Sequence, residues 1–351
     1  MTNKKISINN HNIGFGFPVY IIAELSANHN QDFEEAVRLI HAAKDAGADA
    51  VKIQTYTADT LTISCSNEYF TLGKGTLWDG MNLHDLYKEA YTPWEWQPDL
   101  MKTATQLGMD FFSTAFDSTS VEFLENMNIP AYKIASFELV DHELLSCVAK
   151  TQKPIILSTG MASRQDIGEA IEVIRKESNP QITLLKCTSA YPALPEDMNL
   201  KTIADMSESF GVPVGLSDHS LNTIVPVVAV ALGASIIEKH FTLSRKTPGP
   251  DSAFSLEPGE FREMVDSIRI AEQSLGRVSY DVCPHELASQ TFRRSLFAVE
   301  DIIAGELFTD RNVRSIRPGN GLPPKYLKTL ISRKARKDIT RGTPLSWDLV
   351  D

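Results

Sequence analysis

Two separate apolar runs of this sequence each finish on a histidine. The run "GLSDH" (215–219) ends at His219, and the run "IIEKHF" (236–241) contains His240. Neutral imidazole binds divalent transition ions, and two histidines leave coordination positions open for water or substrate, as Lewis-acid catalysis requires. A lone histidine at a strand end is more often a hydrogen-bonded structural residue. Two on neighbouring strands favour a divalent metal such as manganese or magnesium, with a pair of general acids and bases as the alternative.

Two lysines are embedded in apolar runs, Lys52 in "DAVKIQTY" and Lys133 in "AYKIAS". Burying an unpaired ammonium group is very unfavourable, so each lysine must meet a carboxylate or a bound anion. An internal salt bridge would satisfy one such lysine. Two of them near several strand hydroxyl groups favour a phosphate or carboxylate site.

These side chains need strands to hold them, and the sequence has eight apolar, strand-like runs, most of them followed by a stretch with helical spacing. The runs cover residues 19–25, 49–56, 110–116, 131–136, 154–159, 182–189, 212–219 and 235–241. This alternation predicts a (β/α)8 TIM barrel, in which catalytic groups stand at the carboxyl ends of the strands. A doubly wound open sheet is the alternative, but no glycine-rich dinucleotide fingerprint follows the first run.

Strand alternation then groups the polar residues, because residues two apart share a face. Ser217 therefore goes with His219, and Glu238 goes with His240. Asp218 falls on the opposite face, where we expect a supporting residue and not a third ligand. Lys52 and Gln54 form a pair in the same way.

Two segments interrupt the βα rhythm. Residues 57–97 are too long for a simple connection and are expected to cover one side of the pocket. Their aromatic residues Tyr87, Tyr91, Trp94 and Trp96 could form a ligand wall or pack an inserted helix on the barrel. After residue 280 short strand-like pieces and turns take over. We predict a barrel domain over 1–280, a linker over 281–292 and a small domain over 293–351.

Composition excludes several classes of function. The 34 basic and 45 acidic residues give a net charge of −11, which disfavours nonspecific binding to nucleic acid or to an anionic membrane. The start has no apolar signal core and the chain has no apolar stretch of membrane-spanning length, so a cytoplasmic location is expected. The four cysteines form no CxxC pair, which argues against a thiolate zinc site or a redox motif.

Many motifs, in order along almost the whole chain, resemble the sialic acid synthase family. They are "IIAELSANHN", "VKIQTY", "YKIAS", "ILSTGMAS", "CTSAYP", "GLSDHS", "IEKHFT", "PGPDSAFSLEP", "RSLFAVEDIIAGELFT" and "RPGNGLPP". The segment "GTLWDGMNLHDLYKEAYTPWEWQ" is most similar to the pseudaminic acid branch of that family. The resemblance implies a barrel followed by an antifreeze-like (SAF) domain, in a domain-swapped homodimer where the small domain caps the partner's barrel.

The resemblance also implies a transferase reaction of the 2-keto acid synthase type (EC 2.5.1). Phosphoenolpyruvate condenses with the open-chain aldehyde of an acylamino sugar, giving a nine-carbon 2-keto acid and phosphate. His219 and His240 would hold the divalent metal that polarises the aldehyde. Glu24, Lys52 and Lys133 would be the catalytic residues, with Glu24 as the proton-transfer group.

The resemblance also implies a set of substrate-binding residues from most strands of the barrel. They are Gln54, Thr114, Ser136, Glu138, Ser158, Ser189, Tyr191, Ser217 and Asp251, together with Arg317 from the partner subunit. Three positions depart from the family pattern, with Gln31 in place of glycine, Ala115 in place of proline and Ser189 where asparagine can occur. None of the three replaces a charged candidate residue. They weaken the transfer of the family's role to Ser189 and the assignment of the sugar.

The branch predicts 2,4-diacetamido-2,4,6-trideoxy-L-altrose as the sugar. N-acetylmannosamine or its 2,4-diacetamido-6-deoxy relative, the substrates of N-acetylneuraminate and legionaminic acid synthases, are the alternatives. A noncatalytic sugar-binding protein would be expected to have lost lysines or histidines, and these are intact. A metal-dependent aldolase or hydrolase on the same fold is a third possibility, for which phosphoenolpyruvate would release no phosphate.

Overall fold

The computed structural model describes residues 5–73, 75 and 77–351, and these divide into two units, Met1–Gly276 and Arg277–Asp351. In the described part of the first unit, eight parallel strands close into a barrel, as predicted. They are β3 (Tyr20–Glu24), β4 (Ala50–Thr55), β5 (Asp110–Ala115), β6 (Tyr132–Ile134), β7 (Ile155–Ser158), β8 (Ile182–Cys187), β9 (Val214–Asp218) and β10 (Ile236–His240). Strand β10 pairs with both β9 and β3, which closes the ring.

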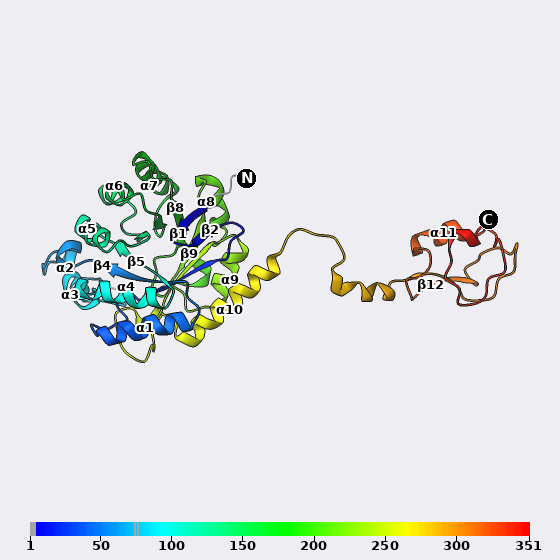
Figure 1. The fold of residues 1–351 in the computed structure, drawn as a ribbon, viewed down its shortest axis with the longest axis horizontal. Coiled ribbons are helices and arrows are strands. Elements are labelled where there is room, and N and C mark those ends of the chain that lie inside the picture. The colour runs from blue at the N-terminus through cyan, green and yellow to red at the C-terminus, as the bar shows by residue number, and fades with distance from the viewer. Residues whose placement is uncertain (1–4, 74, 76) are drawn as a thin grey trace. The chain divides into compact units, whose positions relative to one another are not determined.

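One main helix lies between each strand and the next, outside the ring of strands (Figure 1). The helices are α1 (Phe33–Asp45), α4 (Gln97–Gln106), α5 (Ser118–Asn126), α6 (His142–Lys150), α7 (Arg164–Lys176), α8 (Thr202–Phe210), α9 (Ile224–Ala231) and α10 (Pro258–Leu275). Their buried faces and the outward-facing strand residues form one large apolar core. Helix α8 ends at Phe210, because the next residue, Gly211, adopts the left-handed conformation (φ 73°) that glycine tolerates.

An N-terminal hairpin, β1 (Lys5–Ile8) with β2 (His11–Gly14), lies at the amino-terminal end of the barrel. Ile6, Ile8 and Ile13 are buried against residues of the first halves of the barrel strands, such as Tyr20 and Ala50. The sequence analysis did not predict this hairpin. The hairpin closes the end of the barrel that lies opposite the carboxyl ends of the strands.

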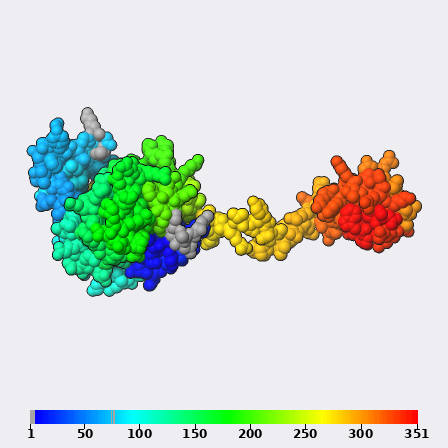
Figure 2. Space-filling model, turned by 90° about the horizontal axis from the view of Figure 1, so that it is seen from above, coloured from blue at the N-terminus to red at the C-terminus, as the bar shows by residue number. Residues whose placement is uncertain are grey.

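The segment between β4 and α4 contains two short helices, α2 (Ala58–Leu61) and α3 (Leu83–Ala90), and stands out as a light-blue lobe of the first unit in Figure 2. Three of its aromatic residues make ring contacts with other parts of the first unit. Tyr87 lies against Tyr56, Trp94 against Phe123, and Trp96 against both His29 and Phe33.

The second unit has its own apolar core, formed by residues such as Leu296, Phe308 and Leu345. It contains an antiparallel pair, β11 (Ser295–Ala298) and β12 (Val313–Ile316), and the short helix α11 (Leu327–Leu330). Between α10 and β11 the chain has only short 3-10 turns, and several large apolar side chains there are exposed. No helix in the described part of the chain combines the length and apolar character that a membrane crossing requires.

Candidate active site

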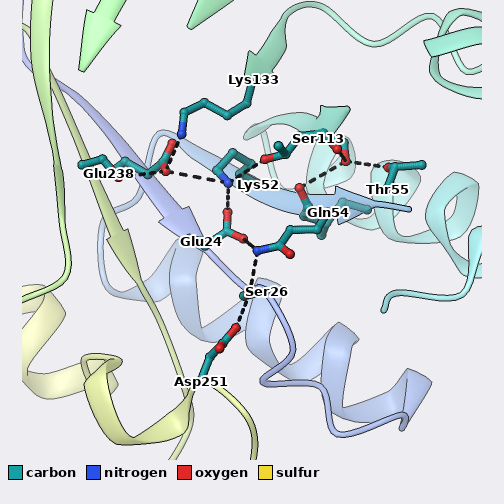
Figure 3. A network of polar contacts seen from close by, with 12 residues as sticks. Glu24, Ser26, Lys52, Gln54, Thr55, Ser113, Lys133, Glu238 and Asp251 are labelled. Carbon is teal, nitrogen blue, oxygen red and sulfur yellow. Dashed lines mark hydrogen bonds and ion pairs between the residues drawn. The ribbon is translucent and has the colours of Figure 1, made fainter. Parts of the chain in front are cut away.

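The carboxyl ends of the barrel strands bring four buried charged side chains into one network (Figure 3). Lys52 on β4 forms an ion pair with Glu24 of the neighbouring strand β3, and its Nζ lies 3.7 Å from Oε1 of Glu238 on β10. Lys133 Nζ on β6 donates to the same Glu238 oxygen at 3.0 Å. The two strand lysines that the sequence singled out therefore share one carboxylate, which satisfies the requirement that each meets an anion.

Burial and the neighbouring charges act differently on the two carboxylates. Burial raises the pKa of Glu24, although Lys52 opposes that rise. Burial acts on Glu238 in the same sense, but the two lysines outweigh it and lower the pKa of Glu238. Glu238 is thus the ionised partner of both lysines, while Glu24 is the better candidate to hold or transfer a proton.

Polar residues on neighbouring strands complete this network. The Oγ1 of Thr114 accepts a hydrogen bond from Lys52 at 3.0 Å, and Ser217 donates to Glu238 at 3.3 Å. Gln54 donates through Nε2 to Glu24 Oε1 at 3.0 Å and to Ser26 Oγ at 2.8 Å. Ser26 in turn donates to Asp251, so the network continues from the barrel interior to the loop after β10 (Figure 3).

Three predicted serines lie around Gly160, which follows β7. The backbone N–H of Gly160 donates to Ser136 Oγ at 3.0 Å, and a Cβ at position 160 would collide with the hydroxyl groups of Ser189 and Ser136. The Oγ of Ser158 is buried without a hydrogen-bond partner among the described residues. Unpaired buried hydroxyl groups are costly, so this cluster is suited to receive the oxygens of an anion.

The two histidines lie side by side, with ring centroids 5.4 Å apart. His219 Nδ1 lies 2.9 Å from the carbonyl oxygen of Thr188, which places the proton on Nδ1 and leaves Nε2 as an acceptor. His240 Nδ1 is buried and has no hydrogen-bond partner among the described residues. Burial, and after it the neighbouring cations, lower the pKa of His240 well below its ordinary value, so this imidazole is neutral.

This pair fits a divalent ion as a set of two protein ligands. Within residues 5–73, 75 and 77–351, no group of three or more His, Cys, Asp or Glu side chains is placed to hold a metal ion. The unpartnered nitrogen of His240 and the fixed tautomer of His219 nevertheless offer two imidazole nitrogens to such an ion, with its other positions left to water or substrate. Asp218 is not a third ligand, because it points outward and pairs with the fully buried Lys239 at 2.5 Å.

Aromatic residues form a wall beside the histidines. The ring centroid of Tyr191 lies 4.3 Å from that of His219. The ring centroid of Phe254 lies 4.9 Å from that of His240 and 5.0 Å from that of Tyr191.

Glu138 has a buried Oε2 without a hydrogen-bond partner among the described residues. Burial raises the pKa of Glu138 to about 7, against the influence of Lys133. The site therefore has an ionic interior, a hydroxyl cluster on one side and an aromatic wall on another.

One predicted site residue, Arg317, belongs to the second unit, where it is exposed and precedes a cis proline, Pro318. Two residues that matter to the geometry were not among the predicted site residues. Glu238 shares a strand face with His240, which was a usable signal, whereas the tight fit of Gly160 against two serines from other strands left no trace in local sequence.

The described fold and site can be compared with known proteins. The model of the NeuB family matches residues 39–280, and that of the SAF domain matches residues 293–351. The chain is 49% identical to the pseudaminic acid synthase of Campylobacter jejuni (strain 81-176), over 93% of this chain and 95% of that protein. It is 35% identical to the N,N'-diacetyllegionaminic acid synthase of Legionella pneumophila, over 96% of each chain.

A solved structure shares the same architecture. The N-acetylneuraminic acid (sialic acid) synthetase from Leptospira borgpetersenii, in complex with citrate, superposes with a TM-score of 0.73 at 32% identity. The match covers 82% of this chain and 95% of the other.

Proposed function

The chain belongs to the NeuB family and carries a SAF domain, and from this premise we propose that it is a pseudaminic acid synthase. It condenses phosphoenolpyruvate with 2,4-diacetamido-2,4,6-trideoxy-L-altrose and water, giving pseudaminic acid and phosphate. The observation that carries the proposal is the buried network of Lys52, Lys133, Glu24 and Glu238 beside the two histidines. The 49% identity to the Campylobacter jejuni pseudaminic acid synthase over 93% of the chain supports the choice of branch.

Phosphoenolpyruvate is a small polyanion, and a net-acidic protein must concentrate positive charge locally to bind it. Lys52 and Lys133 supply that charge, and the hydroxyl groups of Ser136, Ser158 and Ser189 supply hydrogen bonds near Gly160. Before substrate enters, the ionised carboxylate of Glu238 is the shared partner of both lysines. The incoming anion then takes over part of this ionic contact, and its carboxylate and phosphate are held by charge-assisted hydrogen bonds.

Carbon–carbon bond formation turns the aldehyde oxygen of the sugar into a hydroxyl group, which requires a proton. Glu24 is suited to deliver it, because burial raises its pKa and the amide of Gln54 fixes its Oε1. Gln54, Tyr191 and Asp251 lie between the ionic interior and the rim and would orient the sugar chain. Glu138 has a pKa of about 7 and an unpartnered oxygen. Its ionised carboxylate would accept a hydrogen bond from an amide N–H group of the sugar.

His219 and His240 would hold a divalent metal, manganese or magnesium. When bound, this ion supplies Lewis-acid polarisation of the aldehyde carbonyl group. The protein's own contribution is to keep the imidazole of His240 neutral and to fix the tautomer of His219 through the carbonyl oxygen of Thr188.

We further propose a homodimer in which Arg317 of one subunit reaches the sugar bound in the barrel of the other. Apolar side chains are exposed where each part of such an assembly would need a partner. Around the carboxyl ends of the barrel strands, Phe137, Met161 and Leu194 are more than half exposed. In the segment before β11, Tyr280 is 99% exposed. We assign these exposed side chains to the contacts of the homodimer, since large apolar surface left exposed in a monomer is typical of interaction sites.

One assay separates the leading function from its relatives. Purified protein is incubated with phosphoenolpyruvate, manganese and the altrose derivative, and phosphate and the 2-keto acid are measured, with EDTA as the control. Phosphate release that depends on this sugar and stops with EDTA is expected. Turnover only with N-acetylmannosamine or its 2,4-diacetamido relative would reassign the chain to the sialic or legionaminic branch, and no phosphate release with any sugar would contradict the proposal.

Subunit exchange tests the role of Arg317. Arg317→Ala and Lys52→Ala are each expected to be inactive, but a heterodimer of the two contains one barrel with Lys52 and a partner's Arg317. At equal mixing and random exchange, about one quarter of wild-type activity should return. Lys52→Ala mixed with Lys133→Ala is the matched control and should stay inactive, because both changes affect the barrel. Verified Arg317/Lys52 heterodimers without activity would argue against the swapped arrangement.

Gly160→Ala tests the hydroxyl cluster. The added methyl group must displace Ser189 or Ser136, so we expect the KM for phosphoenolpyruvate to rise on the order of 10-fold, equal to about one lost hydrogen bond to a charged group. Gly168→Ala, within helix α7, is the control, since a Cβ there would meet only Phe210 at 4.0 Å. An unchanged KM for phosphoenolpyruvate in Gly160→Ala would exclude this cluster from the anion site.

A further inference from the structure

Trp78 connects the inserted segment to the aromatic wall of the site. Its ring centroid lies 5.9 Å from that of Tyr191 and 6.5 Å from that of Phe254. Its indole N–H donates to the carbonyl oxygen of Pro250 at 3.1 Å, next to Asp251 in the loop after β10. A residue more than a hundred positions away in sequence thus extends the wall that begins at the two histidines.

Trp78 also lines a recess of about 360 Å³ between the inserted segment and the loop after β10. Most of the lining is apolar, including Leu77, Met81 and Leu86 on one side and Pro248 and Ala253 on the other. Among the described residues, Glu89 is the one charged residue of the lining. Because Trp78 belongs both to this lining and to the aromatic wall, the recess adjoins the place where Tyr191 and Asp251 would hold the sugar.

The recess is built before any ligand arrives. Besides the indole hydrogen bond, the side-chain amide of Gln31 donates to the carbonyl oxygens of Glu89 and Tyr91, at 3.0 and 2.5 Å. These bonds tie the end of α3 to the loop after β3, so both sides of the recess are anchored to barrel loops. A preorganised wall loses little conformational entropy when a ligand binds.

We propose that Trp78 and this recess recognise the methyl-bearing substituents of the sugar, namely its 4-acetamido group and its deoxygenated C6. This inference rests on the proposed function, because that sugar carries methyl groups at C6 and on its 4-acetamido group, where N-acetylmannosamine carries hydroxyl groups. Apolar hydrogens pack well on an indole face, whereas a hydroxyl group placed there would lose its hydrogen bonds to water. Trp78 therefore determines specificity for the sugar and has no part in binding phosphoenolpyruvate.

The test compares two sugars in three variants. The sugars are 2,4-diacetamido-2,4,6-trideoxy-L-altrose and 2-acetamido-2-deoxy-L-altrose, which has hydroxyl groups at C4 and C6. Trp78→Ala should lower kcat/KM for the first sugar by about 10- to 200-fold, mainly through KM, since apolar pocket contacts discriminate by such factors. Its kcat/KM for the second sugar and its KM for phosphoenolpyruvate should change by less than about 3-fold. Trp78→Phe should give an intermediate loss and remains informative if the alanine variant unfolds.

Trp94→Phe is the matched control, because Trp94 lies in the same segment but packs on Phe123. Its indole N–H donates a hydrogen bond to the carbonyl oxygen of Tyr56. It should leave the preference between the two sugars unchanged. Equal losses on both sugars in the Trp78 variants, or an unaltered preference, would overturn the inference while leaving the proposed function intact. A wild-type protein that releases phosphate with neither sugar would overturn the proposed function and this inference with it.

Discussion

His240→Ala is expected to lower sugar-dependent phosphate release by on the order of 10³-fold, with the fold retained. The change removes one of the two imidazoles that would hold the metal, and Lewis-acid stabilisation of a developing oxyanion is worth several kcal/mol. The buried Nδ1 of His240 has no partner among the described residues, so its removal breaks no hydrogen bond of the protein. His219→Ala should have a similar effect on activity. Manganese binding, followed by calorimetry, should weaken in parallel with turnover.

His41→Ala is the control for these two variants, since His41 is exposed in the middle of α1. Its activity and manganese affinity should equal those of the wild type. Full activity in His219→Ala or His240→Ala would remove the assignment of that residue as a ligand. Loss of activity with unchanged manganese affinity would instead support the pair as general acid and base.

Lys52→Met should lower kcat/KM for phosphoenolpyruvate by about 10³-fold, since hydrogen bonds to charged groups contribute about 1.5–3 kcal/mol each and Lys52 can make more than one. Lys52 contacts both Glu24 and Glu238, so its loss leaves Glu24 buried without a cation. The pKa of Glu24, already raised by burial, should rise further and keep this residue protonated. Steady-state kinetics with varied phosphoenolpyruvate would measure the effect.

Lys153→Met is the matched control, because it breaks another lysine–carboxylate pair, with Glu125 at 2.7 Å, outside the network of the site. We expect activity within about 2-fold of wild type, as for most partly exposed ion pairs. A Lys52→Met enzyme with unchanged kcat/KM for phosphoenolpyruvate would show that the buried lysines serve only internal salt bridges.

The barrel could be predicted because its signals are local. Each strand is a short apolar run, and its helix has regular spacing and often a glycine at its end, as at Gly211. Alternation within single strands also placed Ser217 with His219 and set Asp218 apart, and the outward pair of Asp218 with Lys239 confirms this. Such assignments depend only on neighbours in sequence.

Features that depend on contacts between distant segments escaped prediction. From the sequence, the acidic partner of Lys52 and Lys133 could have been any carboxylate. Glu238 lies next to these lysines because β10 pairs with β3 and closes the barrel. Trp78 lines the recess. Trp94 and Trp96, for which the sequence allowed either a ligand wall or packing of the insertion, pack the insertion on the barrel. Local patterns do not specify which aromatic ring of a long insertion faces the site.

The hairpin under the barrel has a kinetic consequence. Ile8 and Ile13 are fully buried at that end, so among the described residues the barrel interior is open only at the carboxyl ends of the strands. Lys133 and Ser158 lie on strands β6 and β7, whereas Tyr191 and Asp251 lie in the loops that follow β8 and β10. We therefore expect phosphoenolpyruvate to enter first, and a sugar that arrives first to obstruct it. We therefore expect compulsory-order kinetics, with excess sugar acting as an inhibitor that competes with phosphoenolpyruvate.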